Sequence, residues 1–146
     1  MDFNNINMDI DFNCIEGNVT ENLTDTFTRK IKSSTISSDD FKSYWEKDRR
    51  PKEKDHDSIR KFKGVSVNKI NEFTNESYIA NVYKITFALR PKSKINYCKF
   101  KLLPNAGKIW ETPRVDIPDL SHCTFFKSDQ FTLDSLEVLE VKQITL

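Results

Sequence analysis

Apolar and polar residues alternate along several short stretches of this chain. The first stretch covers residues 6–14, in which isoleucine, methionine, phenylalanine and cysteine are separated by asparagine and aspartate. A repeat of two is typical of a strand with one face in the core and the other in water. We therefore predict a strand over 6–14, followed by a turn at Gly17.

Three segments of the N-terminal half have helical features. In 20–33 apolar residues recur every four positions, which favours a helix, although four threonines in the stretch favour a strand. Residues 37–48 begin with serines and two aspartates, which suit the start of a helix, and Pro51 follows. Residues 57–64 are typical of a short helix that ends in a glycine. We predict helices over 37–48 and 57–64, and favour a helix for 20–33.

Strand patterns dominate the second half of the chain. Residues 78–89 are rich in β-branched and aromatic side chains that favour a strand, but Ile79, Val82 and Tyr83 also fit a helix. Alternation and turn residues predict further strands, at 96–103, 108–110, 121–126 and 135–146. Helices early and strands late indicate an α+β fold. We expect a single compact domain over 1–146, with a mostly antiparallel sheet and two or three short helices in the N-terminal half.

Length and composition favour a single-domain cytoplasmic protein over a secreted, zinc-binding or membrane protein. At 146 residues the chain has the length of one domain with a real core. Its three cysteines, at 14, 98 and 123, are far apart and odd in number, which favours ordinary thiols over disulfides or a zinc site. The N-terminal residues lack the features of a signal peptide, and no apolar stretch is long enough to span a membrane. We expect a cytoplasmic protein with no metal, no cofactor and no membrane partner.

Charge is distributed unevenly, although the net charge is only +1. Residues 1–28 hold six acids and no Lys or Arg, residues 29–108 hold twenty bases against nine acids, and residues 109–146 hold three bases against seven acids. A basic middle segment between acidic ends indicates an anionic partner for the middle segment.

The most basic stretch is 90–110, which carries six Lys or Arg side chains and no carboxylate. We predict a hairpin here, with a strand over 96–103, a turn at 104–107 and a return strand. Its solvent face would carry Tyr97, which could stack on a base, together with a row of basic side chains. The alternative is that these lysines only protect a solvated edge strand. The predicted binding residues are Arg90, Lys92, Lys94, Tyr97, Lys99, Lys101 and Lys108.

The two histidines of the chain lie in similar surroundings. One occurs in His56-Asp57-Ser58-Ile59 and the other in His122-Cys123-Thr124-Phe125. This repeated His-x-[Ser/Thr]-hydrophobic pattern resembles the signature of 2H phosphoesterases, although Asp57 stands where that family has a hydrophobic residue. The resemblance implies that His56 and His122 act as an acid and base pair on a phosphodiester, and that Ser58 and Thr124 hold the phosphoryl oxygens.

The sequence therefore leaves two main functions open. The first is a small binding module, of the regulatory or inhibitor kind found in AT-rich bacteria and their phages, whose basic hairpin engages an anionic macromolecule. Nucleic acid and an acidic protein surface both fit that description. The alternative is a phosphoesterase similar to the 2H family. A purely structural subunit of a larger complex is a third possibility.

Overall fold

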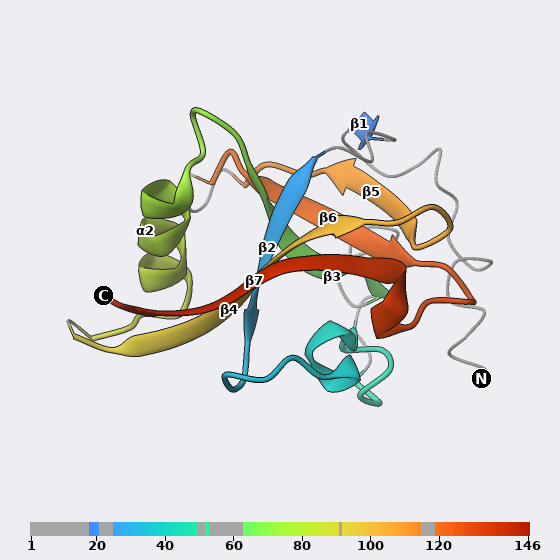
Figure 1. The fold of residues 1–146 in the computed structure, drawn as a ribbon, viewed down its shortest axis with the longest axis horizontal. Coiled ribbons are helices and arrows are strands. Elements are labelled where there is room, and N and C mark those ends of the chain that lie inside the picture. Colours follow the sequence, from blue (N-terminus) through green and yellow to red (C-terminus); the bar gives the residue numbers. More distant parts are fainter. Residues whose placement is uncertain (1–17, 21–24, 50–51, 53–62, 91, 115–118) are drawn as a thin grey trace.

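The structure, a computed structural model, describes residues 18–20, 25–49, 52, 63–90, 92–114 and 119–146. These residues form one antiparallel sheet of seven strands and one α-helix (Figure 1). The elements along the chain are β1 (Asn18–Thr20), β2 (Thr26–Ile31), the 3₁₀ turn η3 (Ser38–Phe41), β3 (Val65–Ile70), α2 (Glu76–Thr86), β4 (Lys94–Leu102), β5 (Gly107–Glu111), β6 (His122–Lys127), the 3₁₀ turn η4 (Leu133–Ser135) and β7 (Leu136–Thr145).

The strand order is β1-β5-β6-β3-β2-β4-β7, so β4 and β5 are not neighbours. Three strands separate them in the sheet, yet only residues 103–106 connect them along the chain. The sheet must therefore curl until the end of β4 approaches the start of β5. The backbone N–H of Ser128, just after β6, donates to the carbonyl of Ala106 in this connection. The predicted hairpin over 96–110 is wrong, because its two strands pair with different neighbours.

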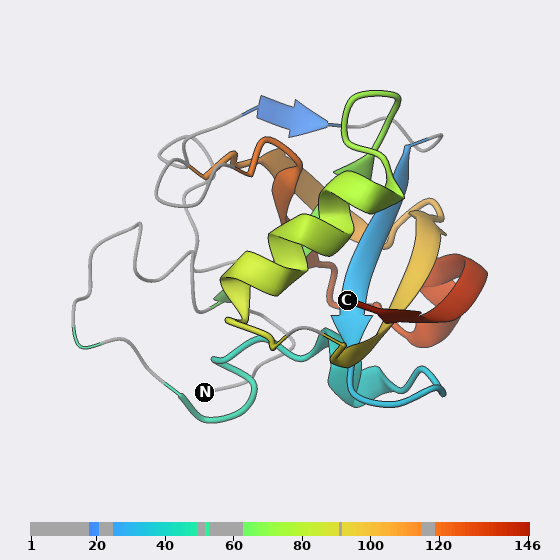
Figure 2. The ribbon, with the colours of Figure 1, turned by 90° about the vertical axis from the view of Figure 1, so that its left-hand side faces the viewer.

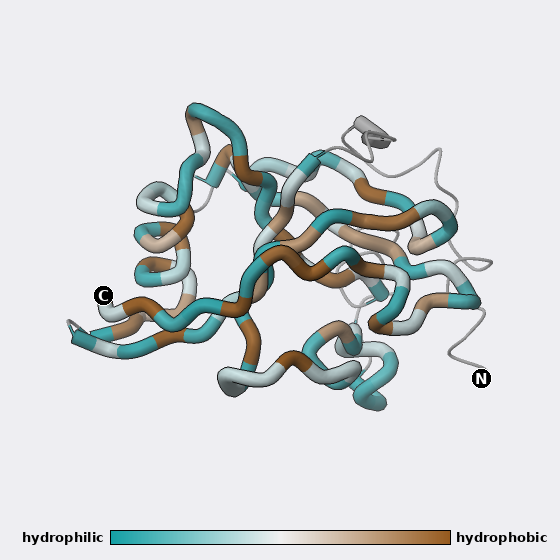
Figure 3. Tube along the Cα trace, viewed as in Figure 1, coloured by the Kyte–Doolittle hydropathy of each residue, from teal (hydrophilic) through white to brown (hydrophobic). Residues whose placement is uncertain are grey.

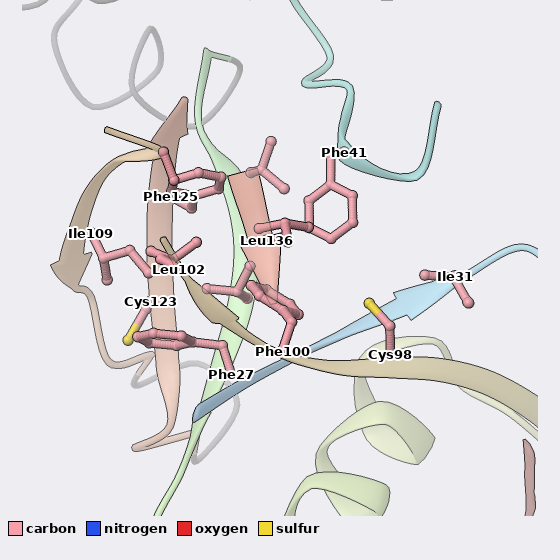
Figure 4. Close-up of a cluster of buried hydrophobic side chains, with 13 residues drawn as sticks. Phe27, Ile31, Phe41, Cys98, Phe100, Leu102, Ile109, Cys123, Phe125 and Leu136 are labelled. Carbon is pink, nitrogen blue, oxygen red and sulfur yellow. The ribbon is translucent and has the colours of Figure 1, made fainter. Parts of the chain in front are cut away.

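The inner face of the curled sheet encloses the main hydrophobic core (Figure 4). Phe100 on β4 is fully buried there, with its ring 6.1 Å from that of Phe27 and 5.4 Å from that of Phe41, centroid to centroid. Phe41 comes from η3, so it anchors the segment after β2 to the core. The remaining buried members are Ile31, Val65, Val67, Cys98, Leu102, Ala106, Ile109, Cys123, Phe125 and Leu136.

Helix α2 packs on the outer face of the sheet (Figure 2). It begins where the side chain of Asn75 accepts a hydrogen bond from the backbone N–H of Tyr78, the usual role of an N-cap asparagine. Ile79 and Tyr83 pack against Ile95 and Tyr97 of β4. Hydrophobic and hydrophilic positions both occur along the helix (Figure 3); Ile79, Val82 and Tyr83 are buried, whereas Ile85 is 58% exposed.

The prediction of two or three helices in the N-terminal half is wrong. Residues 26–31 form β2, an interior strand between β3 and β4, because pairing with strands on both sides holds this segment extended while Phe27 and Ile31 enter the core. In 37–48 only η3 forms: the capping box of Ser37 and Asp40 begins it, and the backbone is already extended at Lys42. Helix α2 covers most of 78–89, where we favoured a strand and left a helix open.

The strands predicted in the second half are confirmed as β4, β5, β6 and β7, with small differences at their ends. The strand predicted over 6–14 and nearly all of the helix predicted over 57–64 lie outside the described residues.

Candidate functional site

The solvent-facing bases of β4 are largely matched by acids from other elements. Lys99 forms ion pairs with Glu76 at 2.7 Å and with Glu140 at 3.7 Å. Lys101 lies opposite Glu137 in the register of β4 with β7. The acidic C-terminal strand therefore lies beside the basic strand, which local sequence alone does not reveal. The acidic neighbours of Lys99 and Lys101 reduce the positive electrostatic potential that these lysines present to a partner.

Tyr97 is not available for stacking on a base. Its side chain is 3% exposed, because α2 covers this part of β4. The phenol hydroxyl donates a hydrogen bond of 3.0 Å to the carboxylate of Glu76. Period-two geometry placed Tyr97 on the outer face correctly, but that face is covered by a helix here.

Glu76 is the centre of a small charged network at the start of α2. Its carboxylate binds Lys99, Lys142 at 3.0 Å and the hydroxyl of Tyr97. The hydrogen bonds from Lys99 and then Lys142 lower the pKa of Glu76 to about 2, against the smaller opposing effect of desolvation. This network fastens the first turn of α2 to β4 and β7.

The network predicts a specific dependence of stability on pH. Because the pKa of folded Glu76 is below its ordinary value, its contribution is complete above pH about 4.5 and is lost as pH falls toward about 2. We expect Glu76→Gln to lower the free energy of unfolding by on the order of 1 kcal/mol at pH 7, after solvent screening, and by less at pH 3. Urea unfolding of both proteins at the two pH values measures this, and an equal difference at both would contradict it.

Other bases gather where α2 ends and β4 begins, and we call this group the basic end. It consists of Lys30, Lys84, Arg90, Lys92 and Lys94. No Asp or Glu occurs between positions 77 and 110 of the chain. Among the described residues, no carboxylate forms an ion pair with any of these five side chains.

Backbone contacts hold the basic end together. The backbone N–H of Leu89 donates to the carbonyl of Lys84, and that of Lys92 donates to the carbonyl of Leu146 after β7. The ammonium group of Lys30, on β2, lies 4.8 Å from the centroid of the Phe87 ring. Phe87 itself remains 48% exposed. The end of α2, the start of β4 and the end of β7 lie at one end of the molecule (Figure 1).

Lys108, the last of the predicted binding residues, is far from this group in the sheet. It lies on β5, which pairs with β1 and β6, whereas Lys94, Lys99 and Lys101 lie on β4. The structure therefore brings together Arg90, Lys92 and Lys94 of the predicted set, and separates them from Lys108. Lys30, Lys84 and Phe87 were missed, although the absence of acids from 77 to 110 was a visible signal for Lys84.

A second group of polar side chains surrounds His122 on β6. Its Nδ1 atom lies 2.8 Å from both the carbonyl oxygen and the Oγ1 atom of Thr112, and its Nε2 atom lies 3.1 Å from Oγ of Ser66 on β3. Thr124, which the sequence pairs with His122, is buried and its hydroxyl lies 2.8 Å from that of Thr112. Ser66 and Thr112 were missed by sequence reasoning because they lie on other segments.

Below this group lies a buried carboxylate. One oxygen of Asp119, which is 2% exposed, accepts hydrogen bonds from the backbone N–H and hydroxyl of Ser121, and the other accepts from the amide of Asn68. His122, Ser66, Asp119 and Asn68 all line a pocket of about 1500 Å³. The pocket continues along α2 to Phe87.

The proposed partner of His122 in a phosphodiester site is outside the described residues, as is Ser58. The acid and base pair of His56 and His122 therefore stays a prediction. Cysteine chemistry is not favoured, because burial raises the pKa of both Cys98 and Cys123 to about 12. The described part of the chain contains no group of three or more His, Cys, Asp or Glu side chains placed to hold a metal ion.

Comparisons with protein-family models, with curated proteins and with solved structures found no match for this chain. Within the described ranges, no helix is both long enough and apolar enough to cross a membrane.

Proposed function

We propose that the protein binds single-stranded nucleic acid through its basic end. The observation that supports this is the gathering of five bases, from three elements and the connection between α2 and β4, beside an exposed aromatic ring, with no carboxylate paired to them in the described part of the chain. Lysine and arginine side chains of this kind bind phosphates. The exposed ring of Phe87 offers a surface on which a base can stack.

Single strands fit this surface better than duplexes. A single strand exposes the faces of its bases, which a ring such as Phe87 can contact, whereas bases inside a duplex are already stacked on one another. The described residues contain no cluster of His and Cys placed to form a zinc finger. An acidic protein is the alternative partner, and the test must distinguish it from single-stranded nucleic acid.

The test compares two double charge reversals by fluorescence anisotropy with labelled single-stranded DNA and RNA. Arg90→Glu/Lys92→Glu changes the basic end, and Lys101→Glu/Lys108→Glu makes the same change in charge elsewhere in 90–110. We expect the first variant to lose at least about 10-fold in affinity and the second to stay within about 3-fold of the original protein. With four or five phosphate contacts, the affinity should fall about 50- to 130-fold between 50 and 200 mM salt.

Two outcomes would contradict the proposal. Equal losses in both variants would mean that general charge, and not the basic end, attracts the nucleic acid. An absence of binding at 50 mM salt would exclude nucleic acid as the partner. Binding of labelled polyglutamate in the same titration, lost in Arg90→Glu/Lys92→Glu, would then assign the basic end to an acidic protein.

A further inference from the structure

We propose that Ser66 and His122 form a nucleophile and base pair that cleaves carboxylic esters in the pocket beside α2. This inference does not depend on nucleic-acid binding by the basic end: Ser66 and His122 are not part of that group, although Lys30 and Phe87 line the same pocket. It rests on the hydrogen bonds of His122, on the exposure of Ser66 and on the position of Arg29.

The first step is the protonation state of the imidazole ring. A backbone carbonyl oxygen can only accept hydrogen bonds, so the 2.8 Å contact between Nδ1 of His122 and the carbonyl of Thr112 places a proton on Nδ1. In the neutral ring, Nε2 then carries a lone pair. Nε2 lies 3.1 Å from Oγ of Ser66 and accepts the hydrogen bond of that hydroxyl.

This is the arrangement that activates a serine. A nucleophile within hydrogen-bond distance of a base, with the base oriented by a third group, is the shared feature of serine hydrolases on unrelated folds. Here the third group is the carbonyl of Thr112. Its position is fixed because the backbone N–H of Thr112 donates to the carbonyl of His122, which continues the β5–β6 ladder by one residue.

Both reacting side chains are held on adjacent strands. Asn68 and Thr124 show the register, since Asn68 lies opposite His122 and Ser66 lies opposite Thr124 in the β3–β6 pair. Ser66 is therefore a diagonal neighbour of His122 on the same face of the sheet. Ser66 is exposed and lines the pocket, so a substrate can reach its hydroxyl.

A positive charge contacts the backbone of Ser66. The guanidinium group of Arg29 donates to the backbone carbonyl of Ser66 at 2.7 Å and to that of Asp40. Burial lowers the pKa of Arg29, but a guanidinium group remains protonated in proteins. A cation held at the backbone of Ser66 would favour the negative oxygen of a tetrahedral intermediate formed on that residue.

The reaction follows from these positions. As Oγ of Ser66 attacks the ester carbon, its proton moves to Nε2 of His122 and the carbonyl oxygen becomes an oxyanion. The carbon–oxygen bond to the alcohol then breaks, and the alcohol leaves with the proton from Nε2. Water, deprotonated by the same imidazole, releases the acid and restores the serine. Esters are the substrate class we commit to because an alcohol needs only this one proton to leave.

The experiment uses a fluorophosphonate probe, in which serine oxygen displaces fluoride from phosphorus. The full chain is treated with the probe, and the modified peptide is identified by mass spectrometry. We expect an adduct on Ser66 that is absent in Ser66→Ala and unchanged in Ser33→Ala, which removes an exposed serine lining the same pocket. His122→Gln should slow the labelling by on the order of 100-fold, the scale of general-base catalysis.

Further readouts keep the test independent of folding. Circular dichroism confirms that each variant is folded, and the control Ser33→Ala should label on Ser66 within about 3-fold of the original rate. Hydrolysis of p-nitrophenyl acetate should follow the same order among the variants. Failure of the folded protein to label on Ser66, or labelling of folded His122→Gln at the original rate, would overturn the proposal.

Discussion

Gly107→Ala should be among the most destabilising single substitutions in this protein. Gly107 has a φ angle of +150°, which residues with a side chain rarely adopt. An added Cβ atom would collide with the backbone oxygen of Phe126 and lie 2.8 Å from Cε1 of Phe125. We expect a loss of about 3–5 kcal/mol in the free energy of unfolding, because strain and overlap act together.

Chemical denaturation of both proteins measures this loss, and Asn105→Gly is the matched control. Asn105 lies in the same β4–β5 connection with a φ angle of 70°, a conformation that glycine adopts without strain. The control should stay within about 1 kcal/mol of the original stability. If Gly107→Ala unfolds at the same denaturant concentration as the original protein, the close approach of β5 to β6 at this point is wrong.

Phe100→Ala should have an effect of similar size for a different reason. The ring of Phe100 is fully buried between those of Phe27 and Phe41. Removing it leaves a cavity as well as losing hydrophobic burial, and such changes cost about 3–5 kcal/mol. The same substitution at Phe73, which is 80% exposed, should change stability by no more than about 0.5 kcal/mol.

A double-mutant cycle extends this prediction to η3. The rings of Phe41 and Phe100 meet edge to face, and such pairs contribute about 0.5–1.5 kcal/mol beyond the area they bury. Phe41→Ala and Phe100→Ala should therefore be less costly together than the sum of their separate effects. Strict additivity in denaturant unfolding would mean that η3 is not packed against β4.

The alternation of apolar and polar residues was sufficient to predict β4 but not to predict β2 or α2. The alternation of Cys98, Phe100 and Leu102 predicted one face of β4 correctly, because all three enter the core. In contrast, 26–31 and 76–86 carry apolar residues that fit a helix or a strand equally well. Contacts with the rest of the fold decide whether each segment is a helix or a strand. Strands on both sides pair with β2 and keep it extended, whereas α2 pairs with no strand and packs across the sheet.

The order in which the strands pair was harder to predict from the sequence than the strands themselves. The predicted hairpin joined two strands that are adjacent in sequence, whereas β4 pairs with β2 and β7. That choice determines which charges meet, since it brings Glu140 of β7 to Lys99 and places Lys108 elsewhere. The sequence predicted only part of the basic end, because Lys30 lies on β2, far along the chain from the other four bases.

The surroundings of His122 were equally hidden in the sequence. The pattern of residues drew attention to His122 and Thr124, which are adjacent in the motif. The atoms that contact the imidazole ring come instead from Ser66 and Thr112, on separate segments of the chain. A four-residue motif identifies residues on the strand that carries the histidine, but it cannot identify the residues that contact the histidine from neighbouring segments.

The position of β6 between β3 and β5 has a consequence for how the protein is made. During synthesis, β3 and β5 emerge before the strand that joins them, so each has an unpaired edge until residues 122–127 appear. Such edges are sites at which unfinished chains associate. A chain truncated before position 122 should therefore expose two strand edges and aggregate more readily than the full chain.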